Sequence, residues 1–205
     1  MTQLSHGVRA LLGQPAIYDA FQSLVGADRM RSEIVYSYLR PWTGARVLDI
    51  GCGTAAILDY MPRVTYVGLD LSKQYIEMAQ ARYGDRATFY ACGVGELATH
   101  IRESFDLILA CGLLHHLDDG PAKTLFADAR LLMTPNGRLV TVDGSWVQGQ
   151  SSIARFLLSL DRGRNVRSPE AYGALARQSF SQVKVQVRHD LLRIPSTLCF
   201  LECSP

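Results

Sequence analysis

The hydrophobic pattern of residues 46–142 alternates between short apolar runs and segments with helical spacing. Five runs are rich in Val, Leu, Ile, Tyr and Phe and are predicted as strands: 46–50, 65–69, 88–91, 105–110 and 138–142. The segments predicted as helices precede or separate them: 28–40, 54–61, 72–83 and 121–133. Strands that alternate with helices favour parallel pairing, so the pattern predicts an α/β sheet covered by helices on both faces.

Residues with strong local preferences stand at the ends of these elements. Ser72 is placed to cap a helix that Gly84 terminates, and Pro121 stands at the start of another helix. Pro41 helps to stop the first helix, and residues 135–137 (Pro-Asn-Gly) are predicted as a turn before the fifth strand.

The C-terminal part of the chain follows a different pattern. Val183, Val185 and Val187 alternate with polar residues, which predicts a half-buried strand, and residues 197–203 form a last strand. The gap after Arg188 is too short for a helical crossover, so the two strands are expected to pair antiparallel. Five β/α units closed by a β-hairpin are therefore predicted.

Length and composition indicate a globular protein. The chain has 205 residues, which is about the size of one domain, with 48% apolar and 20% charged residues. We expect a single domain over 1–205, whose parts are as follows: a helical cap (1–40), a cofactor-binding core (41–143), a lid-like insert (144–167), and the last helix with the hairpin (168–205). The formal charge of +2 gives no support to nucleic-acid binding as the main function.

Three features favour a cytoplasmic protein with no membrane insertion. The five cysteines are scattered and contain no Cys-x-x-Cys pair, which fits reduced thiols. Residues 1–12 lack the pattern of a secretory signal. The longest apolar stretch, 105–117, contains Asp106 and two histidines and is too short to span a bilayer.

The turn after the first strand is the most informative stretch of the chain. In residues 47–54 (Val-Leu-Asp-Ile-Gly-Cys-Gly-Thr), Gly51 and Gly53 allow a tight turn and let a ligand approach the backbone. Asp70 ends the second strand, 21 residues after Asp49, where a carboxylate can accept hydrogen bonds from two ribose hydroxyls. The combination predicts a site for a nucleotide-like cofactor.

Four stretches in order resemble the motifs of class I S-adenosylmethionine (SAM)-dependent methyltransferases: 47–54, 66–72, 104–117 and 134–142. The resemblance covers about residues 28–143. It implies a Rossmann-like seven-stranded sheet with an antiparallel hairpin, SAM as cofactor with S-adenosylhomocysteine as product, and a small-molecule acceptor. Carried over by position, the cofactor-binding residues are Asp49, Gly51, Cys52 and Gly53 beside the methionine part, Asp70 at the ribose, Leu71 and Val94 around adenine, and Cys111 near the amino group.

The sequence departs from this family at two positions. Ala55 replaces the usual third glycine of the loop, and Gly93 stands where an acid often binds the adenine amino group. Adenine recognition is therefore expected to rest on backbone groups. The rival interpretation, an NAD(P)-dependent reductase, would need a glycine where Ala56 stands and would not end in an antiparallel hairpin.

Candidates for catalysis follow the fourth and fifth strands. Histidine suits a general base near neutral pH, and a carboxylate beside it orients the ring. Small-molecule O-methyltransferases of this class often carry a His pair and an Asp here, so the resemblance implies His115, His116 and Asp143 as catalytic candidates. The alternatives are plain packing of His-His-Leu near the cofactor, and a metal site that includes Asp118 and Asp119. Adjacent residues seldom converge on one ion, so no metal is expected.

Two further segments are candidates for ligand contact. The segment around residues 15–22 resembles those that fold over the cofactor, which nominates Tyr18, Phe21 and Arg29, although a packed amphipathic helix explains it equally well. The insert 144–167 has an apolar face expected to press onto the protein body: Ile153, Phe156, Leu157 and Leu160. Its arginines would bind an anionic or polyhydroxylated acceptor, or else form a solvated face or a homodimer contact: Arg155, Arg162, Arg164 and Arg167.

The sequence thus favours SAM-dependent methylation of a small molecule, with a hydroxyl as acceptor. A catalytically silent SAM-binding or interaction domain is the alternative from another class. A protein or nucleic-acid methyltransferase is disfavoured because Cys111-Gly-Leu-Leu114 follows the fourth strand in place of an Asn/Asp-Pro-Pro-Tyr-like motif.

Overall fold

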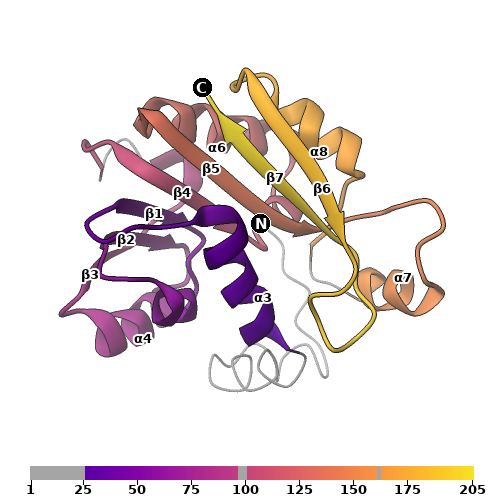
Figure 1. Ribbon diagram of the computed structural model, residues 1–205, viewed down its shortest axis with the longest axis horizontal. Coiled ribbons are helices and arrows are strands. Elements are labelled where there is room, and N and C mark those ends of the chain that lie inside the picture. The colour runs from indigo at the N-terminus through magenta and orange to yellow at the C-terminus, as the bar shows by residue number, and fades with distance from the viewer. Residues whose placement is uncertain (1–25, 97–100, 161–162) are drawn as a thin grey trace.

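A computed structural model describes residues 26–96, 101–160 and 163–205, and its strands form one seven-stranded sheet (Figure 1). The strands are β1 (Arg46–Ile50), β2 (Thr65–Asp70), β3 (Ala87–Ala91), β4 (Phe105–Cys111), β5 (Met133–Gly144), β6 (Gln182–Arg188) and β7 (Leu198–Ser204). Their order is β3-β2-β1-β4-β5-β7-β6, with β1 to β5 parallel and β7 antiparallel to both of its neighbours. The predicted α/β sheet with an antiparallel C-terminal hairpin is confirmed.

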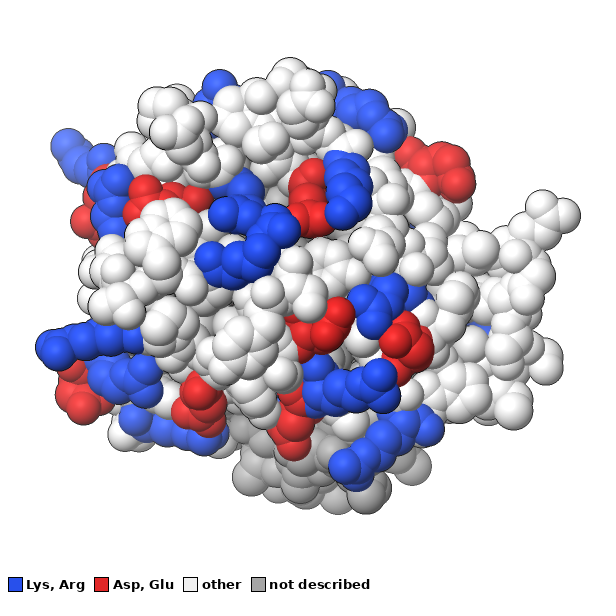
Figure 2. Space-filling model, viewed as in Figure 1, with Lys and Arg blue, Asp and Glu red and all other residues white. Residues whose placement is uncertain are grey.

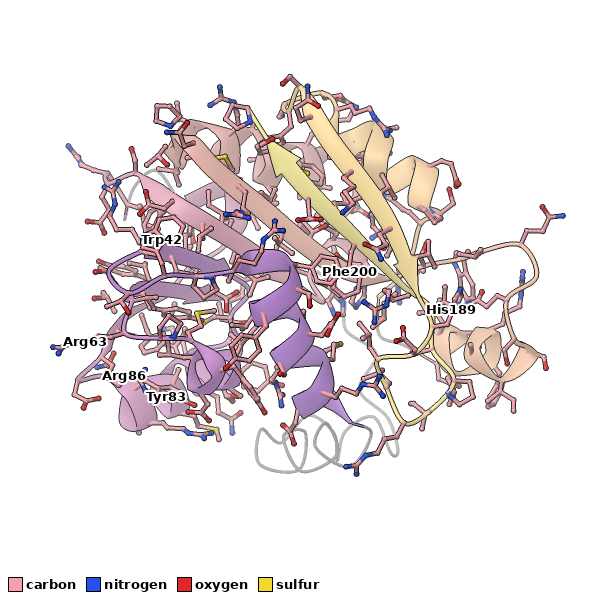
Figure 3. All side chains as sticks on the ribbon, in the orientation of Figure 1. Trp42, Arg63, Tyr83, Arg86, His189 and Phe200 are labelled. Carbon is pink, nitrogen blue, oxygen red and sulfur yellow. The ribbon has the colours of Figure 1, made fainter. Side chains whose placement is uncertain are left out.

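Helices cover both faces of this sheet, because successive strand residues point to opposite sides. Leu48 and Ile50 of β1 pack into one core with α6 (Asp119–Leu132) and α8 (Pro169–Ala176). Val47 packs into the other core, on the side covered by η1 (Ile34–Leu39), η2 (Ala56–Tyr60) and α4 (Lys73–Tyr83). η1 directly continues α3 (Ala27–Glu33). Phe200 of β7 lies in this second core and stacks on Tyr38 with ring centroids 4.2 Å apart (Figure 3).

Several element ends differ from the sequence prediction. The segment 54–61 forms only the short 3₁₀-helix η2, and the predicted helix 28–40 changes from α-helix to π-helix at Ile34. Residues 135–137, predicted as a turn, lie within β5 as an irregularity of its pairing with β4. Phe105 pairs with Met133 and Leu107 with Arg138, so two steps on β4 correspond to five on β5. Extra residues on one strand are accommodated as a bulge.

The helix caps follow the prediction more closely. The Ser72 hydroxyl accepts a hydrogen bond from the Tyr75 amide at 3.3 Å, which caps α4 as expected. Gly84 follows the last residue of α4, but its φ of −64° is right-handed, so its conformational freedom is not what ends the helix.

The insert between β5 and α8 does not press an apolar face onto the protein body. Its helix α7 (Ser152–Ser159) lies apart from the helices that cover the sheet in Figure 1. Ile153, Phe156 and Leu160 are 56%, 62% and 47% exposed, and Ala154 is the buried residue of the helix. The prediction was wrong because helical spacing shows that these side chains share a face, not that another element covers that face.

The surface carries charges of both signs. Figure 2 shows acidic and basic side chains interspersed over the face it presents, which fits the small net charge. Within the described residues, no helix has the length and apolar character needed to cross a membrane.

Candidate active site

The turn after β1 has an open side formed by two glycines in the left-handed region. Gly51 has a φ of 78°, and the Gly51 and Cys52 amides donate to the Leu69 carbonyl at 2.7 and 2.9 Å. A Cβ on Gly51 would lie 3.1 Å from Leu113, whereas a Cβ on Gly53 (φ 55°) would meet no atom within 4 Å. The loop therefore packs against the segment after β4 on one side and leaves room for a ligand at Gly53.

Asp70 connects the end of β2 to this loop. One carboxylate oxygen accepts from the Gly53 amide at 3.0 Å, and the other accepts from the Ser72 amide at 2.8 Å. Burial raises the pKa of Asp70, and the two backbone hydrogen bonds act in the opposite direction. Each carboxylate oxygen has further acceptor capacity, so these bonds leave Asp70 able to accept from hydroxyls of a ligand.

Asp49 lies beneath the loop and is paired with a tyrosine that sequence reasoning missed. It is 2% exposed, and the Tyr66 hydroxyl donates to its Oδ2 at 2.6 Å. Burial raises the pKa of Asp49 to about 7, although the hydrogen bond from Tyr66 lowers it and the charge of Asp70 adds to the rise. The parallel register of β1 and β2, which pairs Val47 with Tyr66, places the two side chains in reach of each other.

A carboxylate does reach the end of β3, although Gly93 stands where an acid was expected. Glu96 folds back, and its Oε2 accepts from the Gly93 amide at 2.9 Å. A Cβ on Gly93 would lie 3.2 Å from the side chain of Leu71, which places Leu71 and Glu96 around the same backbone. An acid three residues after a glycine at a strand end is the local signal that could have revealed this bond. Val94 stands between them at the start of the 3₁₀-turn η3 (Val94–Glu96).

The remaining cofactor candidates differ in their surroundings. Cys111, at the end of β4, packs against the second core, and burial raises the pKa of its thiol to about 12, so it carries no negative charge at neutral pH. Arg29 is exposed and lies 3.8 Å from Asp190 on the surface. Tyr18 and Phe21 lie outside the described residues.

His115 and Asp143 form a buried pair at the ends of β4 and β5. His115 belongs to the 3₁₀-turn η4 (Leu114–His116), and its Nδ1 lies 2.8 Å from Asp143 Oδ1. The backbone amide of His115 donates to the same oxygen at 3.2 Å. His116 is half-buried, and its ring centroid lies 4.2 Å from that of His115. Of the two adjacent histidines, the structure thus places His115 directly on the carboxylate.

Asp143 is almost fully buried. The residue is 3% exposed, and its Oδ2 is buried without a hydrogen-bond partner among the described residues. Burial raises the pKa of Asp143, while the hydrogen bond and the charge of His115 lower it. With its Oδ1 on Nδ1 of the imidazole, Asp143 orients the His115 ring.

The arginines of the insert that the structure describes do not gather at its end. The Arg167 side chain is only 10% exposed and hydrogen-bonds to the segment that carries His115, whereas Arg155 lies over the ring of Trp146 at 5.5 Å. Arg164 is exposed, and Arg162 lies outside the described residues. Helical spacing could not reveal that Arg167 turns inward. The residues that the structure describes hold no group of three or more His, Cys, Asp or Glu side chains that could bind a metal ion.

Comparison with known proteins agrees with this geometry. A family model described as a methyltransferase domain matches residues 48–139, which span the glycine loop, Asp70 and His115. Residues 48–139 therefore form a class I SAM-dependent methyltransferase domain. In a dinucleotide-binding sheet of order 3-2-1-4-5-6, no antiparallel strand is inserted beside the fifth, so the position of β7 also disfavours the reductase interpretation.

According to their names, the relatives that this chain resembles methylate different atoms. A ubiquinone biosynthesis O-methyltransferase of Paracidovorax citrulli is 35% identical over 100 residues, which are 46% of this chain and 42% of the relative. Phosphoethanolamine N-methyltransferase 1 of Zea mays is 28% identical over 178 residues, which are 84% of this chain and 35% of the relative. The chain spans less than half the length of these curated relatives.

Solved structures share the fold. The plantazolicin methyltransferase BamL, in complex with a triazolic desmethylPZN analog and S-adenosylhomocysteine, has a TM-score of 0.71 at 16% identity, covering 98% of this chain and 92% of that one. The mitomycin 7-O-methyltransferase MmcR has a TM-score of 0.68 at 20% identity, covering 94% of this chain and 58% of that one. At these identities the likeness concerns the fold alone.

Proposed function

We propose that this protein transfers the methyl group of SAM to a hydroxyl group of a small molecule, with His115 as the general base. The observation that carries the proposal is the buried hydrogen bond of 2.8 Å between His115 Nδ1 and Asp143 Oδ1. It lies at the carboxyl ends of β4 and β5, at the same edge of the sheet as the glycine loop after β1. Open α/β sheets bind their ligands at this edge.

The residues at the neighbouring strand ends fit the cofactor. The open side of Gly53 admits a ligand close to the backbone, and Asp70 retains acceptor capacity for ribose hydroxyls. Leu71, Val94 and Glu96 would surround the adenine at the end of β3. When bound, SAM supplies a methyl group on a positively charged sulfur, which a nucleophile can attack without further activation of the donor.

The protein must therefore align the acceptor and take up its proton. Asp143 holds Nδ1 of His115, which fixes the orientation of the ring, and in the proposed mechanism Nε2 takes the hydroxyl proton. The carboxylate then stabilises the resulting imidazolium, since the pair is buried. A general base of this kind typically contributes about 10²- to 10⁴-fold to the rate.

A hydroxyl acceptor is favoured over an amine because a hydroxyl loses its proton on methylation and gains most from a base. The names of the relatives include both O- and N-methyltransferases, so each class belongs in the test. The protein is incubated with SAM and a panel of catechols, hydroxyquinols and phosphoethanolamine. Mass spectrometry then measures S-adenosylhomocysteine and any product heavier by one methylene unit.

The expected result is a methylated hydroxyl compound whose formation falls about 10²- to 10⁴-fold in His115→Ala. His189→Ala is the matched control, because His189 is an exposed histidine near the end of β6 (Figure 3). Binding of S-adenosylhomocysteine by titration calorimetry should be the same in both variants. Binding without product from any acceptor would favour the silent SAM-binding interpretation, and full turnover of His115→Ala would refute the assignment of the base.

A further inference from the structure

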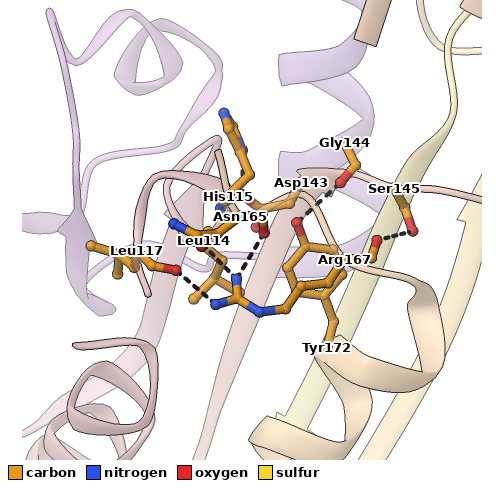
Figure 4. Close-up of polar contacts among 9 residues, drawn as sticks. All are labelled: Leu114, His115, Leu117, Asp143, Gly144, Ser145, Asn165, Arg167 and Tyr172. Carbon is orange, nitrogen blue, oxygen red and sulfur yellow. Dashed lines mark hydrogen bonds and ion pairs between the residues drawn. The ribbon is translucent and has the colours of Figure 1, made fainter. Parts of the chain in front are cut away.

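All five N–H donors of Arg167 form hydrogen bonds, and Figure 4 shows those that go to backbone carbonyls. Nη1 donates to the Leu114 and Asn165 carbonyls, both at 2.9 Å, and Nη2 donates to the Leu117 carbonyl at 2.7 Å. Asp119 Oδ1 accepts from Nη2 at 2.8 Å and from Nε at 3.1 Å. The Leu114 and Leu117 carbonyls stand on either side of His115 and His116, so the guanidinium closes the turn that carries the two histidines.

The backbone of the same residue holds the segment that follows Asp143. The Arg167 carbonyl accepts from the Ser145 hydroxyl at 2.9 Å and from the Trp146 amide at 3.2 Å. Two residues before it, the Asn165 amide donates to the His115 carbonyl at 3.0 Å. One short stretch of chain is thus bonded to both segments on which the buried pair stands.

The remaining side of the guanidinium is packed. Its central carbon lies 5.8 Å from the ring centroid of Tyr172, and the Tyr172 hydroxyl donates to the Gly144 carbonyl at 3.1 Å. Gly144 directly follows Asp143. The contacts of Arg167 therefore link the end of β4, the end of β5 and the start of α8 in one connected network.

We propose that Arg167 is a positioning residue that holds the His115 imidazole against Asp143. This inference rests on the proposed function, in which His115 is the base. Without the guanidinium, the Leu117 carbonyl loses this donor, and the Leu114 carbonyl keeps the Leu117 amide at 3.1 Å but loses its charged donor. The three-residue turn η4 can then move relative to β5. A lysine cannot replace it, because a single ammonium lacks the planar fork that reaches several acceptors at once.

The first test needs no acceptor. In the wild-type protein, the hydrogen bond to Asp143 should protect the His115 Nδ1 proton from exchange and give it a downfield signal in proton NMR spectra. This signal is assigned by its absence in His115→Ala. We expect Arg167→Met to lose the signal by exchange with water. Arg63→Met, at an exposed arginine before the start of β2 (Figure 3), should retain it.

The second test is a double-mutant cycle with the acceptor found as described above. Arg167→Met should lower kcat about 10- to 100-fold, with the acceptor KM and the affinity for S-adenosylhomocysteine unchanged within about twofold. In the His115→Ala background the same substitution should have no further effect, because it acts through His115. Arg167→Lys should restore less than half of the lost kcat.

The outcomes separate the two proposals. Equal losses of kcat in both backgrounds, or a retained downfield signal in Arg167→Met, would overturn the positioning role. If His115→Ala keeps full turnover, the proposed base fails, and the NMR signal still decides whether Arg167 holds the pair. Should Arg167→Met fail to fold, Asp119→Ala is the milder variant, since it removes two of the five bonds at a side chain that is 71% exposed. It should weaken the same signal, and an unchanged signal would overturn the proposal.

Discussion

Replacement of Asp70 is the sharpest test of the cofactor site. Its carboxylate accepts the Gly53 and Ser72 amides at 3.0 and 2.8 Å and is the ribose acceptor of the proposed function. A hydrogen bond to a charged group contributes about 1.5–3 kcal/mol. Asp70→Ala removes the ribose acceptor and also releases the amide of Gly53, so we expect the Kd of S-adenosylhomocysteine to rise about 10- to 150-fold.

Titration calorimetry with S-adenosylhomocysteine measures this change directly, without an acceptor. Asp70→Asn is the informative companion, because it keeps one oxygen for a backbone amide but loses the charge. Its Kd for S-adenosylhomocysteine should lie between those of the wild type and Asp70→Ala. Glu77→Ala, at an exposed acid on α4, is the control for loss of a surface charge. A Kd within twofold of wild type in Asp70→Ala, at unchanged melting temperature, would show that the nucleoside does not meet this carboxylate.

Three further substitutions test the chemistry of the strand ends and the loop. Asp143→Asn should lower turnover at least about 100-fold, because the amide cannot stabilise a charged imidazole. The unfolding free energy should not fall, because burial already disfavours the charged carboxylate of Asp143, and lost stability with full turnover would contradict this. Burial in the folded protein raises the pKa of Asp49 to about 7, so folded Asp49 keeps a proton that Asp49 of the unfolded chain loses near pH 4. The unfolding free energy should therefore fall as the pH rises from 4 to 7. Denaturation at pH 5 and pH 8 should show that Asp49→Asn removes part of this loss, at most about 4 kcal/mol, and an unchanged pH slope would refute the assignment. Ala55 has a φ of 56°, so Ala55→Gly should relieve strain and raise the unfolding free energy by up to about 1 kcal/mol in thermal melts, where a lower melting temperature would contradict the reasoning.

The elements and the cofactor loop could be predicted from the sequence because their signals are local. The strand over 46–50 was predicted with the same bounds, and Ser72 caps its helix as its position indicated. The antiparallel pairing of β6 and β7 could be predicted because the connection between them is too short for a helical crossover. The length of that connection is visible in the sequence alone. The same holds for Gly51 and Gly53, whose left-handed φ values suit the residue type.

The pairing of side chains across the strand ends was decided only by the tertiary structure. His115 and His116 are indistinguishable as neighbours in sequence, and the register of β4 and β5 together with the turn after β4 brings one of them to Asp143, 28 residues away. Tyr66 reaches Asp49 for the same reason, through the register of β1 and β2.

The insert illustrates the same limit. Its spacing correctly indicated a helix, but the sequence could not show that Phe156 stays exposed or that Arg167 turns inward to the histidine turn. Periodicity reports which residues share a face, because it depends on backbone geometry within one element. What covers that face depends on where distant segments lie, and the tertiary structure alone determines this.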